Sequence, residues 1–160
     1  MKLICGGQSG VDRAVFDVAI ARGLAYGGWC PKGGWAEDFP QPPGLLARYP
    51  ALQETPLADL AQRMEWNARD ADACMILIDP AGIDVSAGTR LAEELAHRYR
   101  KPLLIAQLGE RDAAERSKLW LRVQQARHRD GLTLAIGGPR ESEAPGIYAR
   151  AKDFIGALLD

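Results

Sequence analysis

Few residues of this chain could hold a metal or form a disulfide framework. Its 160 residues include only three cysteines and two histidines. Three cysteines cannot all pair, which favours a reduced, cytoplasmic compartment. Cys5 and Cys74 lie in apolar runs, so we expect them to be small buried hydrophobes. No His/Cys cluster has metal-ligand spacing, and we therefore expect no metal ligated by the protein.

An excess of one charge and a long apolar run are both missing. The formal net charge is −1, so no basic field argues for nucleic acid. No apolar stretch is long enough to span a membrane, and Lys2 is followed by only three apolar residues, too few for a signal peptide. With 47% hydrophobic and 26% charged residues, the composition is that of a globular protein, and we expect residues 1–160 to form a single domain.

The glycine-rich stretch near the start matches neither a Walker A loop nor the dinucleotide fingerprint. It follows the apolar run 3–5 and precedes a helical pattern that ends at Gly23. A strand, a glycine-rich turn and a helix present free backbone N–H groups to an anion. We therefore predict a phosphate-binding turn made of Gly6, Gly7, Gln8, Ser9, Gly10, Asp12 and Arg13. The competing interpretation is that the glycines only let the helix pack close to the strand.

Arg13 favours the binding interpretation. A cation in the first turn of a helix opposes the helix dipole, so it is a poor choice for helix stability alone. It suits a bound anion, and we expect Arg13 at the rim of the site, outside the core, with Lys32 as a second charge partner.

Apolar runs and helical patterns alternate along the chain and predict an α/β fold. Strands are expected near residues 3–5, 26–29, 73–78, 103–106 and 132–136. Alternation of this kind indicates a Rossmann-like three-layer sandwich with a five-stranded, or slightly larger, parallel sheet. We expect the first and third of these strands to be adjacent in the middle. Helices are expected at 55–71, with Thr55 as N-cap, and at 112–129, with a core stripe of Leu119, Val123 and Ala126.

Three turns that follow the first, third and fifth strands should meet at one edge of the sheet, where such folds bind ligands. The second turn contributes Ser86, Gly88 and Thr89, and the third contributes Gly138 and Arg140. The long segment 30–55 adds Lys32, Glu37 and Asp38. On the helix that follows, Arg63 and Asn67 share one face, which is either solvated or directed into the site.

These motifs in combination resemble the molybdenum cofactor carrier family. The matching stretches are Gly6–Arg13, Gly27–Gly33, Ala36–Asp38, Glu54–Pro56, Arg63–Asn67, Gly138–Ser142 and Pro145–Tyr148. The resemblance covers nearly the whole chain and implies a Rossmann-like fold, a homo-oligomer (dimer or tetramer) and a phosphorylated molybdopterin as bound cargo. Ala87 departs from the family, which more often has glycine there.

The fold also resembles the wider group that contains the nucleotide phosphoribohydrolases. Members of that group carry a glutamate three residues after the threonine of the second turn. Here that position is Ala92, and Glu93 comes one residue late, a rotation of about 100° around a helix. This departure from the group's pattern puts in doubt that the chain hydrolyses a glycosidic bond as the phosphoribohydrolases do.

Three functions remain open from the sequence. The first is a non-catalytic carrier of a phosphorylated pterin, with Trp29 or Trp35 as the aromatic surface and Glu37 or Asp38 on the amino-pyrimidinone edge. The second is a nucleotide-binding or nucleotide-processing enzyme, whose acid or base would be one of Glu37, Asp38, Asp79 and Glu93. The third is a sensor or partner-binding module. No nucleophile–base pair is evident, which favours binding over catalysis. Four tryptophans in a chain of this size favour a homo-oligomer.

Overall fold

The computed structural model describes all residues from Met1 to Asp160. It contains one sheet of six parallel strands, in the spatial order β3-β2-β1-β6-β4-β5. The strands are β1 (Lys2–Ile4), β2 (Ala25–Cys30), β3 (Leu52–Glu54), β4 (Ala73–Ile78), β5 (Leu103–Gln107) and β6 (Thr133–Gly137). The helices are α1 (Val11–Ala21), α2 (Leu45–Arg48), α3 (Leu60–Asp70), α4 (Ala87–Arg98), α5 (Ala113–Arg127) and α6 (Ile147–Leu158), and a short 3-10 turn, η1, covers Ile83–Val85. The predicted Rossmann-like α/β class is confirmed.

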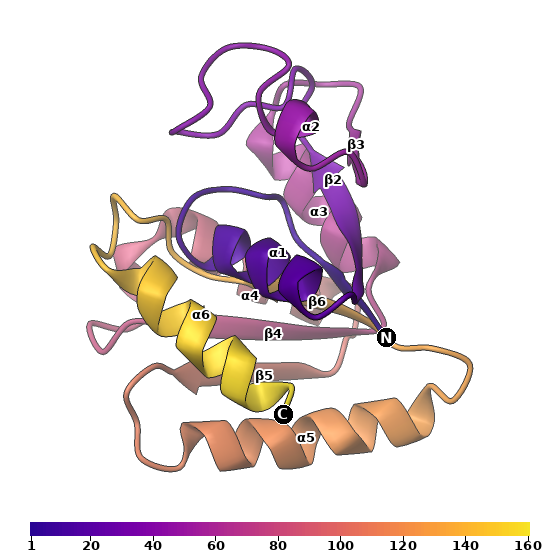
Figure 1. Cartoon of the computed structure of the whole chain (residues 1–160), viewed down its shortest axis with the longest axis vertical. Helices are drawn as coiled ribbons and strands as arrows, with labels where there is room; N and C mark the ends of the chain where they lie inside the picture. The colour runs from indigo at the N-terminus through magenta and orange to yellow at the C-terminus, as the bar shows by residue number, and fades with distance from the viewer.

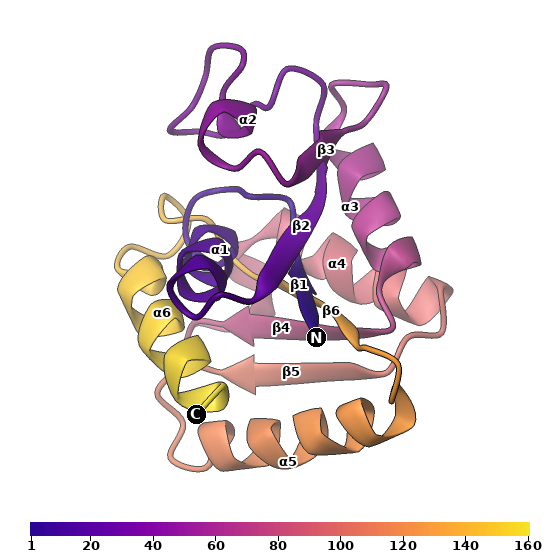
Figure 2. The ribbon, with the colours of Figure 1, turned by 45° about the vertical axis from the view of Figure 1, so that its right-hand side comes forward.

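Helices cover both faces of the sheet. Helices α1 and α6 pack together on one face, and α3 and α4 pack together on the other (Figures 1 and 2). Helix α5 lies beside α6 and along the edge strand β5. None of the helices combines the length and the hydropathy that a membrane-spanning segment needs.

The predicted order of the central strands is wrong. We expected β1 beside the strand at 73–78, now β4, but β6 lies between them and pairs with both. The last strand of the chain thus occupies the middle of the sheet. Its Leu134 and Ile136 are fully buried, as the middle position requires. Apolar content does not separate a central strand from its neighbours, because strands in a parallel sheet covered on both faces all read as continuous apolar runs.

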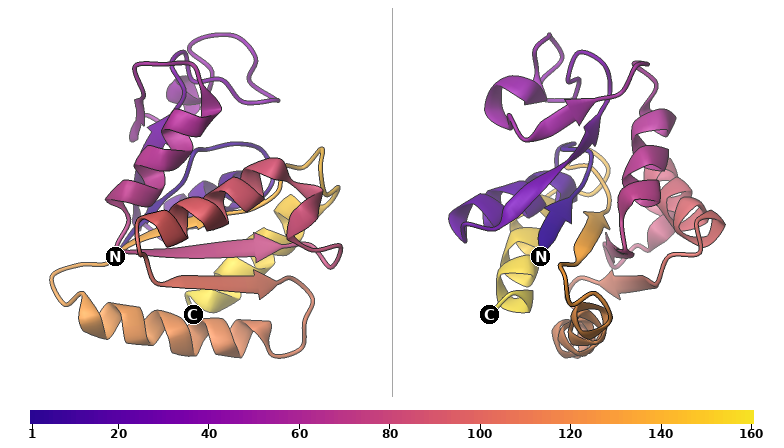
Figure 3. Two further views of the ribbon diagram at one scale, coloured as in Figure 1. Left: turned by 180° about the vertical axis from the view of Figure 1, so that it is seen from behind. Right: turned by 90° about the vertical axis from the view of Figure 1, so that its right-hand side faces the viewer.

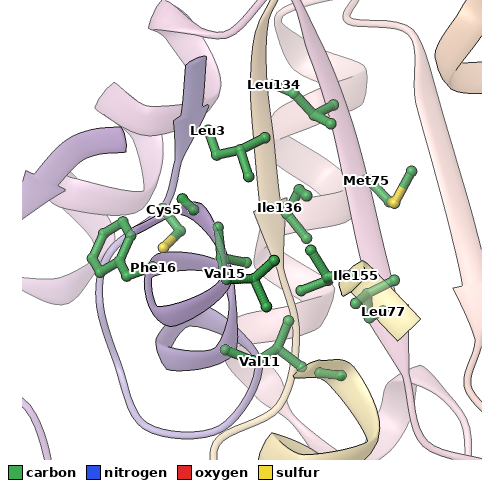
Figure 4. Packing of buried hydrophobic residues seen from close by; sticks show 14 of the residues in the cluster. Leu3, Cys5, Val11, Val15, Phe16, Met75, Leu77, Leu134, Ile136 and Ile155 are labelled. Carbon is green, nitrogen blue, oxygen red and sulfur yellow. The ribbon is translucent and has the colours of Figure 1, made fainter. Parts of the chain in front are cut away.

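The two faces of the sheet are packed unequally. On the α1 and α6 side, large side chains such as Leu3, Phe16 and Ile155 form a cluster of 27 buried residues, part of which is drawn in Figure 4. On the α3 and α4 side, the buried cluster has only four members: Ile4, Ala71, Cys74 and Ala96. Small side chains on this second face leave unfilled space between α3, α4 and the sheet.

Two expected helices differ from those in the structure. Helix α3 is capped by Asp59, whose carboxylate accepts from the N–H of Ala61 at 2.9 Å, and begins at Leu60. The hydroxyl of Thr55, the predicted cap, instead donates toward the carbonyls of Cys30 and Leu57. Helix α5 turns a different face inward. Its buried residues are Ala113, Ser117, Leu121 and Gln124. All three predicted core residues are exposed: Leu119 by 65%, Val123 by 42%, and Ala126.

Candidate functional site

A cavity of about 300 Å³ lies at the C-terminal edge of the central strands, between α3 and α4. Figure 3 (left) shows these two helices side by side on this face. All three turns singled out in the sequence contribute: Gly6, Gln8 and Asp12 from the first, Ser86–Thr89 from the second, and Gly137, Gly138 and Arg140 from the third. Arg63 and Asn67 of α3 also line it.

The rest of the lining is apolar and was not predicted. The sheet contributes the floor, α3 one wall and α4 the other; these residues are Ile4, Cys5, Cys74, Met75, Ile76, Ala135, Ile136, Leu60, Ala61, Met64, Ala68, Leu91 and Ala92. Burial raises the pKa of the Cys74 thiol to about 11, so this thiol is protonated at neutral pH. Apolar residues of this kind carry no sequence signal that separates a cavity lining from an ordinary core.

Arg63 is the most unusual polar side chain of the site. It is 9% exposed, and its guanidinium donates no hydrogen bond within the protein; its Nε atom is buried without any partner. The nearest opposite charge is Asp12, whose Oδ2 lies 3.5 Å from Nη1. Gly6 makes room for this arrangement, because a Cβ there would lie 1.6 Å from Arg63 Nη1. A buried guanidinium without hydrogen bonds is costly unless a ligand completes it.

Asp12 is the only carboxylate that lines the cavity. Burial raises the pKa of this carboxyl, and the nearby Arg63 opposes that effect. Its Oδ2 accepts from the backbone N–H of Gln8 at 3.3 Å. The amide of Asn67 is already used, since it both accepts from the N–H of Trp29 and donates to its carbonyl, at 2.9 Å each. Asn67 therefore joins α3 to β2.

The N-terminus of α4 forms the other polar end of the cavity. The hydroxyl of Ser86 caps the helix by accepting from the N–H of Thr89 at 3.1 Å. Thr89 is only 2% exposed, and its buried hydroxyl has no hydrogen-bond partner in the protein. The other backbone N–H groups in the first helical turn of α4 have no acceptor inside the helix, and the helix dipole favours an anion there.

Part of the Gly6–Arg13 turn is packed against the protein and is not open to a ligand. The N–H of Val11, at the start of α1, donates to the carbonyl of Pro139 at 3.3 Å. Gly10 has φ +74°, and a Cβ on it would lie 2.4 Å from the same carbonyl. Gly7 packs against the side chains of Phe16, Leu45 and Leu52. These two glycines therefore serve close packing, which was the competing interpretation.

Arg13 is buried, so its expected position outside the core is wrong, and it does not line this cavity. Its guanidinium binds Asp38 through two hydrogen bonds of 2.7 and 2.9 Å and lies over the rings of Phe39 and Tyr49. Burial acts to raise the pKa of Asp38, but the hydrogen bonds and charge of Arg13 outweigh it, and the pKa is lowered. The pair lines a separate, more polar cleft of about 420 Å³.

The other predicted residues of segment 30–55 also lie outside the cavity. Glu37 binds the hydroxyls of Ser9 and Ser142, which joins this segment to the third turn. Lys32 is exposed and lines neither cavity. None of the four tryptophans lines the cavity; Trp29 donates to Asp70 at 2.7 Å and packs edge-on against Trp66. The expected aromatic surface is therefore absent from the cavity lining, and its place is taken by aliphatic side chains and Met64.

The Arg13–Asp38 pair gives a stability prediction. Arg13→Ala should lower the free energy of unfolding by about 1–3 kcal/mol, because it removes a buried cation from a partly exposed carboxylate and two rings. Arg48→Ala is the matched control, since Arg48 lies over the same Tyr49 ring and is exposed; it should change stability by less than about 0.5 kcal/mol.

Chemical denaturation at several pH values would measure both variants. The folded-state pKa of Asp38 is lowered, so its contribution is present above the unfolded pKa of about 3.9 and is lost as the pH falls below it. The difference between the parent protein and Arg13→Ala should shrink in acid. Equal stability of the two proteins at neutral pH would show that the ion pair contributes nothing.

Comparison with known proteins identifies the family. The model of the circularly permutated YpsA SLOG family matches residues 3–159. A crystal structure from Syntrophus aciditrophicus SB, named "Putative molybdenum carrier protein", superposes with a TM-score of 0.84 and 36% sequence identity, over 99% of this chain and 94% of that chain. No curated protein gives a significant match. The family resemblance drawn from the motifs is thereby confirmed, and the chain belongs to the circularly permutated YpsA SLOG family.

Proposed function

We propose that this protein binds a phosphorylated pterin, molybdopterin or the molybdenum cofactor built on it, as a carrier or storage protein. One observation carries the proposal. A single cavity contains two buried polar side chains with unmet hydrogen-bonding capacity, the Arg63 guanidinium and the Thr89 hydroxyl, on either side of an apolar floor. A ligand with polar groups at both ends and a flat apolar body satisfies all three features.

The phosphate of this ligand is best held at the start of α4. Thr89 supplies a hydroxyl, the first helical turn of α4 supplies backbone N–H groups, and Arg140 supplies a cation at the rim. The pterin body would lie against the aliphatic walls and Met64. The related structure carries the name of a molybdenum carrier, which agrees with this assignment.

The nucleotide enzyme is the weaker alternative. None of the four acids considered for catalysis, Glu37, Asp38, Asp79 and Glu93, lines the cavity. Ala92, at the position where the phosphoribohydrolases carry glutamate, does line it. Asp79 is paired with Arg150. These placements support a binding role for the cavity.

Native mass spectrometry tests the proposal. The protein would be produced in cells that make molybdopterin and purified without oxygen. We expect a mass increase that matches one molybdopterin, with or without molybdenum, per chain. A nucleotide mass would support the alternative, and a chain with no ligand from such cells would overturn the carrier proposal.

We also propose that the protein assembles as a homo-oligomer. Four large apolar side chains are exposed on the isolated chain: Ile20, Leu57, Leu119 and Val123. Burial of such side chains favours association. Sedimentation at micromolar concentration should show a dimer or a larger species, and Leu119→Glu should shift it toward monomer if α5 contributes to the contact. A monomer under all conditions would exclude the assembly.

A further inference from the structure

The polar end of the cavity near β1 is formed by two side chains of opposite charge. Asp12 and Arg63 lie 3.5 Å apart, and the two residues are only 6% and 9% exposed. Within the protein the Asp12 carboxylate accepts from the backbone N–H of Gln8 through Oδ2, and the backbone N–H of Gly6 also stabilises its charged form. Its Oδ1 faces Gly137, 3.6 Å from where a Cβ would stand. A carboxylate has about four acceptor sites and a guanidinium has five donors, so most of the combined hydrogen-bonding capacity of Asp12 and Arg63 is unused within the protein.

This end is unsuited to a phosphate. The Asp12 carboxylate already balances the charge of Arg63 and would repel a second anion at the same place. A neutral edge that offers donors and an acceptor side by side fits better. Its N–H groups would bind the carboxylate, and its carbonyl oxygen would accept from the guanidinium.

The amino-pyrimidinone edge has this pattern: a carbonyl, a ring N–H and an amino group in a row. Pterin and guanine both present it. Hypoxanthine lacks the amino group, and adenine lacks the carbonyl. We infer that Asp12, together with Arg63, reads this edge of the ligand and sets the specificity of the cavity; the inference rests on the proposed function.

The dimensions of the fold agree with this assignment. Strands β1 and β4 are separated by β6 alone, so their ends are two strand spacings apart, about 10 Å. Asp12 follows β1, and the α4 N-terminus follows β4. A ligand that places its phosphate at Thr89 can thus place its heterocycle edge at Asp12.

Calorimetric titration with GMP, IMP and AMP tests the inference, because these three probes share the phosphate and differ at the edge. The wild-type protein should bind GMP about ten- to a hundred-fold more tightly than AMP, with IMP between them. For the Asp12→Asn variant, the dissociation constants of GMP and IMP should agree within about three-fold. Its affinity for inorganic phosphate should be unchanged or higher, since a negative charge is removed.

Asp17→Asn is the matched control. Asp17 is on the same helix and accepts hydrogen bonds from Tyr49 and Tyr148, outside the cavity. This variant should keep the full preference for GMP. Equal binding of the three nucleotides by the wild-type protein would overturn the inference and leave the proposed function standing, as would an Asp12→Asn variant with the wild-type preference. If none of the probes binds and the purified protein carries no pterin, the proposed function fails, and the inference fails with it.

Discussion

Arg63→Ala is expected to weaken binding of a phosphorylated pterin by about a hundred-fold. The guanidinium is buried, donates no hydrogen bond to the protein and lines the cavity, so its hydrogen bonds are available to a ligand. Charge-assisted hydrogen bonds contribute about 1.5–3 kcal/mol each, and a hundred-fold loss corresponds to about 2.7 kcal/mol. Calorimetry or equilibrium dialysis under anaerobic conditions would measure it.

Two further variants make this result specific. Arg69→Ala removes the same charge from the same helix, but Arg69 lies outside the cavity and over Trp66; its affinity should match that of the parent. Arg63→Lys keeps a cation near Asp12 and loses the planar fork, so it should restore only part of the affinity. Equal losses in Arg63→Ala and Arg69→Ala would show that only overall charge matters.

Gly10→Ala is expected to be the most destabilising of the substitutions considered, by about 3–5 kcal/mol. The residue has φ +74°, where an L side chain costs about 1–2 kcal/mol. In addition, the new methyl group would lie 2.4 Å from the Pro139 carbonyl and 2.8 Å from the backbone of Arg140 and Glu141. Backbone atoms in a packed loop cannot move aside cheaply, so overpacking adds to the strain.

Gly23→Ala separates the two contributions. Gly23 has a similar φ of +64°, but no atom lies within 4 Å of the position of its Cβ. It should therefore show the strain alone, about 1 kcal/mol. Denaturant unfolding of both variants gives the comparison. If the two substitutions lower the free energy of unfolding equally, the contact between the Gly6–Arg13 turn and the turn after β6 is not tight.

Sequence patterns predicted the fold class because hydrophobic periodicity reflects local burial, and every predicted strand is present. The extra strand β3 is only three residues long and lies at the edge, so it leaves little apolar signal. The position of β6 was not predictable in this way, because strand order depends on contacts between distant parts of the chain.

The candidate site was predicted in part for a similar reason. Turns that follow parallel strands must reach the same edge of the sheet, so Gly6, Thr89 and Gly138 could be placed there from order alone. The direction in which a charged side chain points within such a turn could not be predicted from the order of the elements. Arg13 and Asp12 are adjacent in sequence, yet Asp12 lines the cavity and Arg13 lines the opposite cleft with Asp38. A helix turns by about 100° per residue, which is enough to separate them.

A crystal structure with a bound phosphorylated ligand tests the central claim most directly. Molybdopterin is the preferred ligand, and GMP is the stable substitute with the same edge. The account predicts phosphate density at the N-terminus of α4, within hydrogen-bond distance of Thr89, and the heterocycle edge against Asp12 and Arg63. A ligand seated instead in the polar cleft beside Arg13 and Asp38, with Arg63 still unbonded, would contradict it.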